Sequence, residues 1–409
     1  MSATQLHAAT EPGSPLRIVF VPSHHYGQVG PGSDFAKRVD KMWGLFKNHV
    51  FFRRYLSRIS AWRIDAIRQN DMNPNLPDQF GNDAVILKWV QSEVSGFDPK
   101  KGDVFVFCVG LPENGNVRSD QNPPQVTMAF GGEASIVHEL GHAIGNLGDE
   151  YGGNWVNQGH PEYANVAENA PGYTCQEKWG DMMGLVVHAH PALPQIANNY
   201  PTKIGCFANA HALNWYKPTD RHCLMNQCGS EWPFCPVCQR HLEKVMHRYG
   251  TGESTVTFET LPDGFEIKQP LLLKGNEFLA YGVKFSPAPH HYAASLKTQP
   301  AILTGGFGAP QNYLGMVQEN NHQQPVSRNI SIAFDWPLKE VKITFYGATS
   351  RYHLQAYDAA GNLLATAYQN AVLHQGPFQI TVRDPQNNIR KVEFGEDQSI
   401  TVITKIQYR

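Results

Sequence analysis

A short histidine-containing segment in the first half of the chain has the residues best suited to metal chemistry. His138 and His142 are four residues apart, so on a helix both imidazoles project from one face and can bind one zinc ion. Glu139 follows His138 and can reach a water molecule at that ion without being a ligand. This H-E-x-x-H arrangement predicts a zinc site with a general base beside it.

A catalytic zinc ion needs a third protein ligand and leaves one position for water. Asp149 and Glu150 come shortly after His142, beyond Gly145, which we expect to end the helix in a left-handed turn. We favour Asp149 as the third ligand, and Glu150 stays open as the alternative. Tyr151 is a candidate donor to the oxyanion of the reaction, although packing is the commoner role for a tyrosine after a helix.

The cysteines are unevenly placed along the chain. Four of them crowd one segment, namely Cys223, Cys228, Cys235 and Cys238. Their spacing fits two disulfides, a structural zinc site or free thiols, and we favour disulfides. Cys175 and Cys206 form a further candidate pair. Cys108 lies in an apolar run and is expected to be a buried free thiol.

The combined motifs resemble metallopeptidase family 64, the IgA-peptidase family of metzincin-like zinc peptidases. The resemblance covers about residues 16–250 and rests on residues 138–142 (HELGH), 149–151 (DEY), 223–225 (CLM) and 234–238 (FCPVC). It implies a zinc endopeptidase in which His138, His142 and an acidic residue bind the metal and Met225 lies beneath the histidines. In the metzincin pattern the third ligand stands where this chain has Gly148, so the spacing here is longer by one residue. Immunoglobulin A is not implied as the substrate.

The expected mechanism follows from charge. Zinc polarises the scissile carbonyl and lowers the pKa of bound water toward about 7, while Glu139 takes the water proton and passes it to the leaving amine. The oxyanion is expected to be held by zinc and by a donor such as Tyr151. In related enzymes an edge strand binds extended substrate, and residues 125–130 (QVTMAF) are the candidate strand here.

The elements that must position these residues follow from the hydrophobic pattern. Strand and helix signals alternate along the first 150 residues, with strands near 16–21, 58–67 and 103–111 and helices near 34–49, 83–94 and from Glu133. Ser33 is the expected N-cap of the helix near residues 34–49. A further helix is expected over 235–249. Beyond residue 252, roughly ten short strands follow one another without helices, as in a β-sandwich.

We therefore predict three parts: an N-terminal tail at residues 1–15, a metzincin-like zinc peptidase domain of the α/β (α+β) class at 16–252, and an all-β, jelly-roll-type sandwich domain at 253–409. The sandwich is expected to target the enzyme to a substrate or surface. Its aromatic residues Tyr281, Tyr292, Tyr346 and Tyr357 could form a sugar-stacking face, although packing is the commoner role.

Composition limits the partners. The chain has 34 Lys+Arg, 36 Asp+Glu and a formal net charge of -2, which speaks against nucleic acid and anionic membranes as partners. No apolar run is long enough to span a membrane. Residues 1–15 show no export signal, whereas the cysteines and the peptidase class point outside the cell, so we expect an extracellular monomer, with the cytoplasm as the alternative location.

The leading hypothesis is thus a zinc-dependent endopeptidase that acts on a protein or glycoprotein substrate, with glycan contact through the sandwich. One alternative is a carbohydrate- or glycoprotein-binding protein with a vestigial metal domain. Another is a zinc amidase that hydrolyses a non-peptide amide. An intact Glu139 favours the enzyme over the binding protein.

Overall fold

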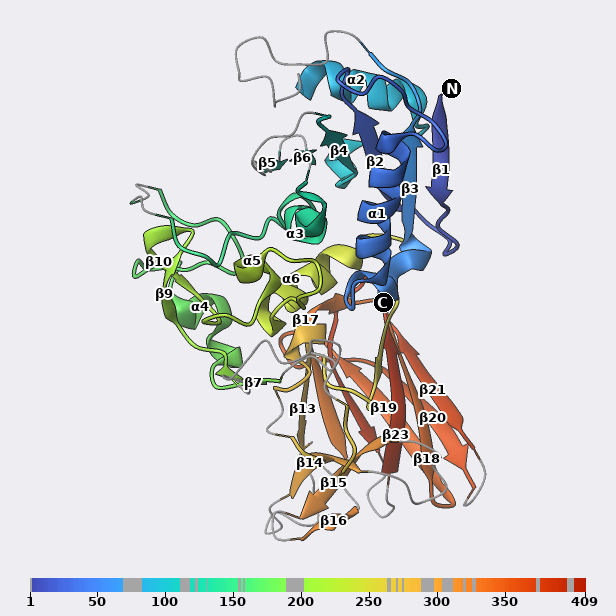
Figure 1. Ribbon diagram of the computed structural model, residues 1–409. Coiled ribbons are helices and arrows are strands. Elements are labelled where there is room, and N and C mark those ends of the chain that lie inside the picture. Colours follow the sequence, from blue (N-terminus) through green and yellow to red (C-terminus); the bar gives the residue numbers. More distant parts are fainter. Residues whose placement is uncertain are drawn as a thin grey trace. The chain divides into compact units, whose positions relative to one another are not determined.

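The chain divides into two compact units in a computed structural model (Figure 1). Unit 1 comprises Met1–Gly184 and Thr202–Thr251, and unit 2 comprises Leu185–Pro201 and Gly252–Arg409. The structure describes residues 2–68, 83–110, 118–121, 124–129, 131–153, 156, 159–188, 202–262, 266–269, 271–273, 276–287, 298–303, 312–318, 321–325, 329–372, 376–395 and 401–409. The main division lies close to the boundary that the sequence predicted, but Leu185–Pro201 groups with unit 2, which the sequence did not predict.

Unit 1 is built on a six-stranded mixed sheet with the order β1-β3-β2-β4-β6-β5. Its strands are β1 (Ala3–His7), β2 (Leu16–Pro22), β3 (Ile59–Ile64), β4 (Val104–Cys108), β5 (Arg118–Gln121) and β6 (Pro124–Met128). Neighbouring strands among β3, β2, β4 and β6 pair in parallel, whereas β1 and β5 pair antiparallel at the two edges. Every residue of β4 is buried, as expected for a central strand covered on both faces.

The structure differs from the prediction at both edges of this sheet. Residues 1–15 are not a tail, because β1 within them pairs with β3. Ala3 lies opposite Ile64, and His7 lies opposite Ala61. Residues 125–130 are not the edge strand, because β6 lies between β4 and β5. Phe130 lies outside the described residues. The outer strand on this side is therefore β5, a segment without a clear strand pattern in the sequence.

Helices and short elements complete unit 1. The α-helices are α1 (Asp34–Asn48), α2 (Asp83–Glu93), α3 (Ile136–Gly145), α4 (Cys175–Trp179), α5 (Leu224–Gln227) and α6 (Pro236–Met246). The 3-10 helices are η1 (Phe52–Arg58), η2 (Pro99–Lys101), η3 (Glu133–Ser135) and η4 (Gly180–Met182), and the short strands are β7 (Val186–Val187, in unit 2), β8 (Thr202–Lys203), β9 (Phe207–Ala210) and β10 (Ala212–Lys217). The expected cap of α1 is confirmed, because the Ser33 hydroxyl accepts a hydrogen bond from the N–H of Ala36 at 3.1 Å.

Helix α3 ends one residue later than predicted, because Gly145 is still helical and does not form the left-handed turn. The left-handed residue is Asn146, with φ of 46°, and its N–H donates to the carbonyl of His142 at 2.8 Å. Gly145 is the last residue of the helix. A Cβ at this position would lie 2.6 Å from Cδ2 of Leu242, so the glycine allows α3 to pack closely on α6.

Unit 2 is a β-sandwich. Its strands are β11 (Ser254–Thr257), β12 (Leu271–Leu272), β13 (Val283–Pro287), β14 (Thr298–Leu303), β15 (Tyr313–Gln318), β16 (Asn321–Pro325), β17 (Ile330–Leu338), β18 (Glu340–Gly347), β19 (Ser350–Tyr357), β20 (Leu363–Ala371), β21 (Phe378–Arg383), β22 (Ile389–Gly395) and β23 (Thr401–Tyr408), with one 3-10 helix, η5 (Leu279–Tyr281). They form an eight-stranded sheet around β23 and a five-stranded sheet with the order β13-β17-β22-β19-β20. Phe345 of β18 contacts Tyr352 of β19 and Phe394 of β22 across the interior, so the two sheets share one core. Strands β19 and β20 form an antiparallel hairpin, with Ser350 opposite Ala371.

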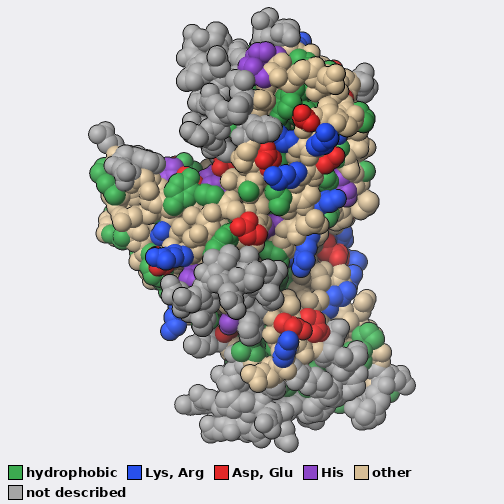
Figure 2. Space-filling view, in the orientation of Figure 1, with side chains coloured by type: hydrophobic (Ala, Val, Ile, Leu, Met, Phe, Trp, Pro, Cys, Tyr) green, Lys and Arg blue, Asp and Glu red, His purple; other side chains and the backbone are tan. Residues whose placement is uncertain are grey.

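Charged side chains of both signs lie on the face of the molecule in Figure 2. Figure 2 shows basic and acidic side chains lying among one another on the face in view, in keeping with the formal net charge of -2. None of the helices in the described residues is both long and apolar enough to cross a bilayer.

Substituting Gly145 with Ala tests the close packing of α3 on α6. We expect a loss of about 1–3 kcal/mol in the free energy of unfolding, because the Leu242 side chain must shift to admit a methyl group. Gly44→Ala in α1 is the matched control, since a Cβ there meets nothing within 4 Å and the substitution should stabilise by about 0.5–1 kcal/mol. Denaturant unfolding measures both, and equal effects of the two substitutions would contradict the packing argument.

Candidate metal centre

Helix α3 and the loop that follows it bring three predicted ligands to one point. The Nε2 atoms of His138 and His142 lie 3.1 Å apart, and each lies 3.1 Å from Oδ1 of Asp149. The four-residue spacing places the histidines on one helix face, and the turn at Asn146 returns the chain toward them. Asp149, the acidic residue that we favoured, therefore lies against both histidines.

The hydrogen bond that Nδ1 of each histidine makes determines whether Nε2 can bind a metal ion. Nδ1 of His138 lies 3.1 Å from the carbonyl oxygen of Leu224, and Nδ1 of His142 bonds the carbonyl of Leu147. A carbonyl only accepts hydrogen bonds, so both Nδ1 atoms carry hydrogen and both neutral rings direct a lone pair through Nε2. Two lone pairs and a carboxylate oxygen then face one another, a donor set that fits a cation. Neutral imidazole and carboxylate are ligands that zinc prefers.

Glu139 lies at the edge of this group. Its Oε1 is 3.8 Å from Nε2 of His138, and Glu139 with the two histidines also has the spacing of a metal-binding group. Its side chain is buried, and burial raises the pKa of Glu139 above its usual value. A carboxyl group with a raised pKa next to a candidate metal site is a stronger proton acceptor than an ordinary glutamate.

Asp149 has a third histidine partner that the sequence analysis missed. Nδ1 of His211 lies 3.5 Å from Oδ2 of Asp149. Burial alone would raise the pKa of Asp149, but the bonds to the three histidines outweigh it and hold the pKa well below its usual range. His211 forms the tip of the β9–β10 hairpin with φ of 55°, and its ring stacks on Trp215 at 5.4 Å. No local motif marks this residue, since only the pairing of β9 with β10 brings it to the site.

Tyr151 also lies at the site. Its ring stacks on that of His138 at 6.0 Å and 21°, while 42% of the residue is exposed. Burial of the hydroxyl group and the nearby carboxylate of Asp149, to which the hydroxyl bonds, raise the pKa of Tyr151. The ring of Tyr151 therefore packs on a predicted ligand, and its hydroxyl lies near Asp149.

The side chain of Met225 lies against α3. Its side chain is fully buried, and a Cβ on Gly141 would come within 3.0 Å of its sulfur. The glycine between the two histidines thus lets the methionine approach the helix backbone. The preceding residue, Leu224, supplies the carbonyl that bonds His138, so this turn orients a predicted ligand directly.

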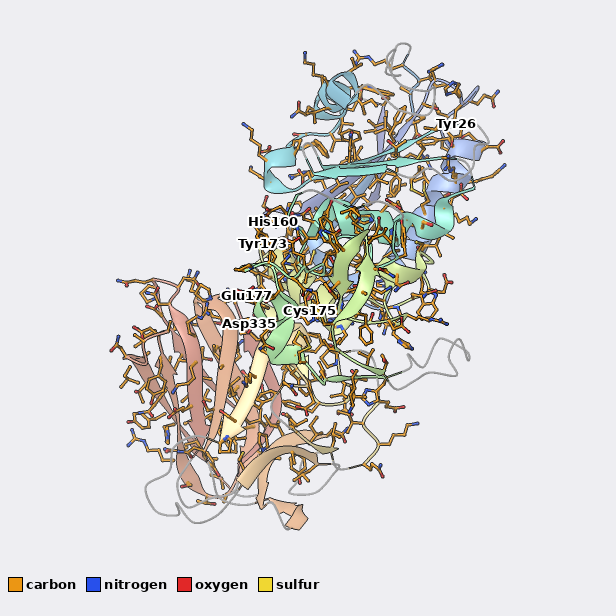
Figure 3. All side chains as sticks on the ribbon, turned by 90° about the vertical axis from the view of Figure 1, so that its left-hand side faces the viewer. Tyr26, His160, Tyr173, Cys175, Glu177 and Asp335 are labelled. Atoms are coloured by element: carbon orange, nitrogen blue, oxygen red, sulfur yellow. A yellow bond between two sulfur atoms is a disulfide. The ribbon has the colours of Figure 1, made fainter. Side chains whose placement is uncertain are left out.

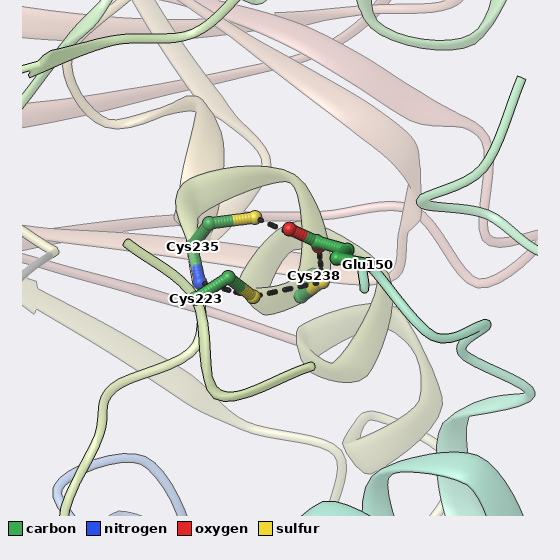
Figure 4. A group of neighbouring side chains, drawn as sticks. All are labelled: Glu150, Cys223, Cys235 and Cys238. Atoms are coloured by element: carbon green, nitrogen blue, oxygen red, sulfur yellow. Dashed lines mark hydrogen bonds between the residues drawn. The ribbon is translucent and has the colours of Figure 1, made fainter. Parts of the chain in front are cut away.

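Glu150 belongs to a different group, which also contains Cys223, Cys235 and Cys238 (Figure 4). All four residues are buried, and Oε1 of Glu150 lies 3.2 Å from Sγ of Cys238. These cysteines and Cys228 are free, so the disulfides that we favoured among them are not present. The thiol of Cys228 instead interacts with His138 at the first site and helps to raise the pKa of that histidine. The structure separates the four cysteines that the sequence grouped together.

One disulfide is present, between Cys175 and Cys206, with the two Cα atoms 6.0 Å apart. Cys175 begins α4 and is labelled with Glu177 in Figure 3. Thr174 and Glu177 form a capping box at the start of this helix. The bond ties α4 to the segment before β9, and thus to the hairpin that carries His211. Cys108 is buried and free, as the sequence predicted.

Comparisons with known proteins give distant likenesses of fold. No family model and no curated protein matches the sequence. Two cleaved adhesin domains of Lys-gingipain, one from Porphyromonas gingivalis, each match 38% of this chain with a TM-score of 0.24, at 12% and 16% identity over 99% and 97% of their own length. A family 11 carbohydrate-binding module from Clostridium thermocellum matches 34% of this chain and 90% of its own, with 11% identity and a TM-score of 0.20.

Thiol counting tests the distribution of the seven cysteines. In denaturant with a metal chelator and no reductant we expect five reactive thiols, and seven after reduction, because one disulfide is present and five cysteines are free. A colorimetric thiol reagent measures both values. Seven thiols before reduction would contradict the Cys175–Cys206 bond, and three or fewer would show further disulfides.

Proposed function

We propose that the protein is a zinc-dependent endopeptidase of the metallopeptidase family 64 type and that unit 1 carries the reaction. The observation that supports it is the convergence of His138, His142 and Asp149 at 3.1 Å, with Glu139 at 3.8 Å from His138. Two histidines and one carboxylate leave a fourth zinc position for water or substrate, which is the ligand number of catalytic zinc sites.

Each residue has a task in this reaction. Bound zinc supplies Lewis-acid polarisation of the scissile carbonyl and lowers the pKa of water. Glu139 takes the proton of the attacking water and delivers it to the leaving amine, since its carboxyl group is buried beside the ligands. Tyr151 offers its hydroxyl to the oxyanion from its place over the ring of His138. His211 holds Asp149 on the side away from the other two histidines.

The position of β5 supports a polypeptide as the substrate. This strand is the last in the sheet and lies beside α3, the helix that carries His138 and Glu139. An extended peptide can add to such an edge through main-chain hydrogen bonds, which would place its backbone next to the metal ligands. A small non-peptide amide, the substrate of the amidase alternative, has no extended backbone that could pair with a strand edge.

An extracellular location is part of the proposal. The Cys175–Cys206 disulfide forms and persists in oxidising compartments and is rare in the reducing cytosol. The free thiols of Cys223, Cys235 and Cys238 are fully buried, which protects them from oxidation outside the cell.

A second candidate function is glycan binding through unit 2. The aromatic residues named from the sequence support it poorly, because Tyr281 packs on Phe278, Tyr346 packs on the core, Tyr357 lies under Lys391, and Tyr292 is outside the described residues. Tyr368 of β20 is a better candidate. It is 58% exposed, and the guanidinium of Arg351 lies 4.0 Å from its ring centroid, which keeps the ring on the surface in a fixed position.

Glu139→Gln tests the proposed peptidase. We expect cleavage of a denatured protein substrate to fall by about 100-fold or more with zinc still bound, because the amide cannot take the proton from water. Cleavage is followed by electrophoresis and zinc by elemental analysis of the full chain. Glu231→Gln, at an exposed carboxylate of unit 1, is the matched control and should keep full activity. Unchanged cleavage by Glu139→Gln would refute the mechanism.

The Glu139→Gln chain also tests the second candidate, because it can bind a glycoprotein without cutting it. If unit 2 binds glycans, the variant should be retained on immobilised glycans, and adding Tyr368→Ala should weaken retention by about 10-fold or more. Absence of retention on a broad glycan array would count against glycan binding. Retention together with inactive, zinc-loaded wild-type protein would favour the binding protein over the peptidase.

A further inference from the structure

We propose that Glu150, Cys223, Cys235 and Cys238 form a second metal site, a closed structural zinc site separate from the one at His138 and His142. All four residues belong to unit 1, and each offers one ligand atom within 4.8 Å of the others (Figure 4). The existence of this site does not depend on the peptidase proposal.

The distances match a tetrahedral zinc ion. With Zn–S near 2.3 Å and Zn–O near 2.1 Å, tetrahedral angles place two sulfurs about 3.8 Å apart and a sulfur and an oxygen about 3.6 Å apart. Sγ of Cys223 and Sγ of Cys238 are 3.7 Å apart. Oε1 of Glu150 is 3.7 Å from Sγ of Cys235 and 3.2 Å from Sγ of Cys238. The sulfur–sulfur distance is far from the 2.0 Å or so of a disulfide.

The backbone around two of the thiols is suited to negatively charged ligands. Cys235 is the N-cap of α6 and Cys238 lies in its first turn, where the helix dipole stabilises negative charge. The N–H of Cys235 donates to Sγ of Cys223 at 3.3 Å. Such an N–H···S bond orients the sulfur and stabilises negative charge on it, as outer-shell partners of metal ligands do.

Glu150 is held as an oriented ligand would be. The carboxylate receives hydrogen bonds from Nδ2 of Asn165 to Oε1 and from the hydroxyl of Thr219 to Oε2, both at 3.1 Å. Asn165 is itself bonded to Gly148 through both of its amide atoms at 2.8 Å, so its position is fixed. A fully buried carboxylate beside three buried thiolates is costly unless cations balance the negative charge.

Charge balance is consistent with zinc. Three thiolates and one carboxylate around a divalent ion leave two formal negative charges, and buried charge needs a partner. Lys217 is 8% exposed, and its ammonium group interacts with both Glu150 and Cys223. The lysine therefore supplies positive charge to the cluster from inside unit 1.

The donor set selects the metal and the role. Three sulfurs and one oxygen in a four-coordinate arrangement suit zinc and exclude magnesium and calcium, which take oxygen ligands. All four ligands come from the protein and all are buried, so no position is open to a substrate. The site is structural and not catalytic.

The second site would hold the first one in place, an aspect that does rest on the proposed function. Glu150 directly follows Asp149, and its N–H donates to the carbonyl of Met225 at 2.8 Å. Cys223 begins the turn in which the Leu224 carbonyl bonds His138. A metal on Glu150 and Cys223 therefore fixes the backbone on both sides of the histidine site.

Elemental analysis of the purified full chain tests this proposal. We expect two zinc ions per wild-type chain and one in His142→Ala, because the second site keeps its ligands. Adding a mercurial reagent to His142→Ala should release that one zinc in step with modification of its thiols. One zinc in the wild type and none in a folded His142→Ala would overturn the proposal.

Cysteine variants locate the site. Cys238→Ser should lose one zinc, whereas Cys228→Ser should keep the second site, since its thiol lies at His138. With cobalt in place of zinc, the thiolate-to-cobalt absorption should vanish in Cys238→Ser and persist in Cys228→Ser. Loss of that absorption in Cys228→Ser would indicate the four-cysteine site instead of Glu150. If Cys238→Ser does not fold, the mercurial release from His142→Ala still decides the question.

The same measurements separate the two proposals. If the histidine site binds no metal, the wild type and His142→Ala will each contain one zinc that the mercurial reagent releases, and the second site stands while the peptidase proposal fails. If both sites bind zinc but no substrate is cleaved, only the catalytic assignment fails. Zinc that no mercurial reagent releases, with full cleavage activity, supports the peptidase and overturns the second site.

Discussion

The metal-ligand region of unit 1 depends on two adjacent acidic residues whose side chains lie in different clusters. Asp149 contacts two histidines of α3, while Glu150 lies among three thiols. Because Glu150 is fully buried and bonded by Asn165 and Thr219, the backbone on its N-terminal side has little freedom. The position of the predicted catalytic ligand is thus set by the burial of its neighbour.

The turn that contains Met225 also holds the predicted ligands in position. Its backbone carbonyls bond His138 and Glu150, and its side chain packs where Gly141 leaves room on α3. Each contact alone is modest, but together they fix the ring nitrogen, the carboxylate and the helix relative to one another before any metal binds. Such preorganisation is what a catalytic zinc site needs, since a ligand displaced by even 1 Å loses much of its effect.

The parts of this arrangement that are local in sequence could be predicted. A helix alone is enough to bring His138 and His142 to one face. The cap at Ser33 could be predicted because the residues after it favour a helix. His211 could not be found in this way. It reaches Asp149 through a hairpin within a long segment that lacks periodicity, and only the tertiary fold decides which end of that hairpin faces α3. The outer strand β5 was not predicted for the same reason, because nothing in its own four residues indicates that it pairs with β6.

The cysteines show why spacing misleads when ligands come from distant segments. Cys228 is close in sequence to Cys223, yet it ends α5 in a left-handed conformation, with φ of 60°, and its thiol interacts with His138. The fourth member of the buried cluster is instead Glu150, which is 85 and 88 residues from Cys235 and Cys238. A buried carboxylate must have partners wherever the chain places it, and this requirement acts through space. Sequence spacing can propose a set of ligands, but the cost of burying an unpaired charge selects which of them meet.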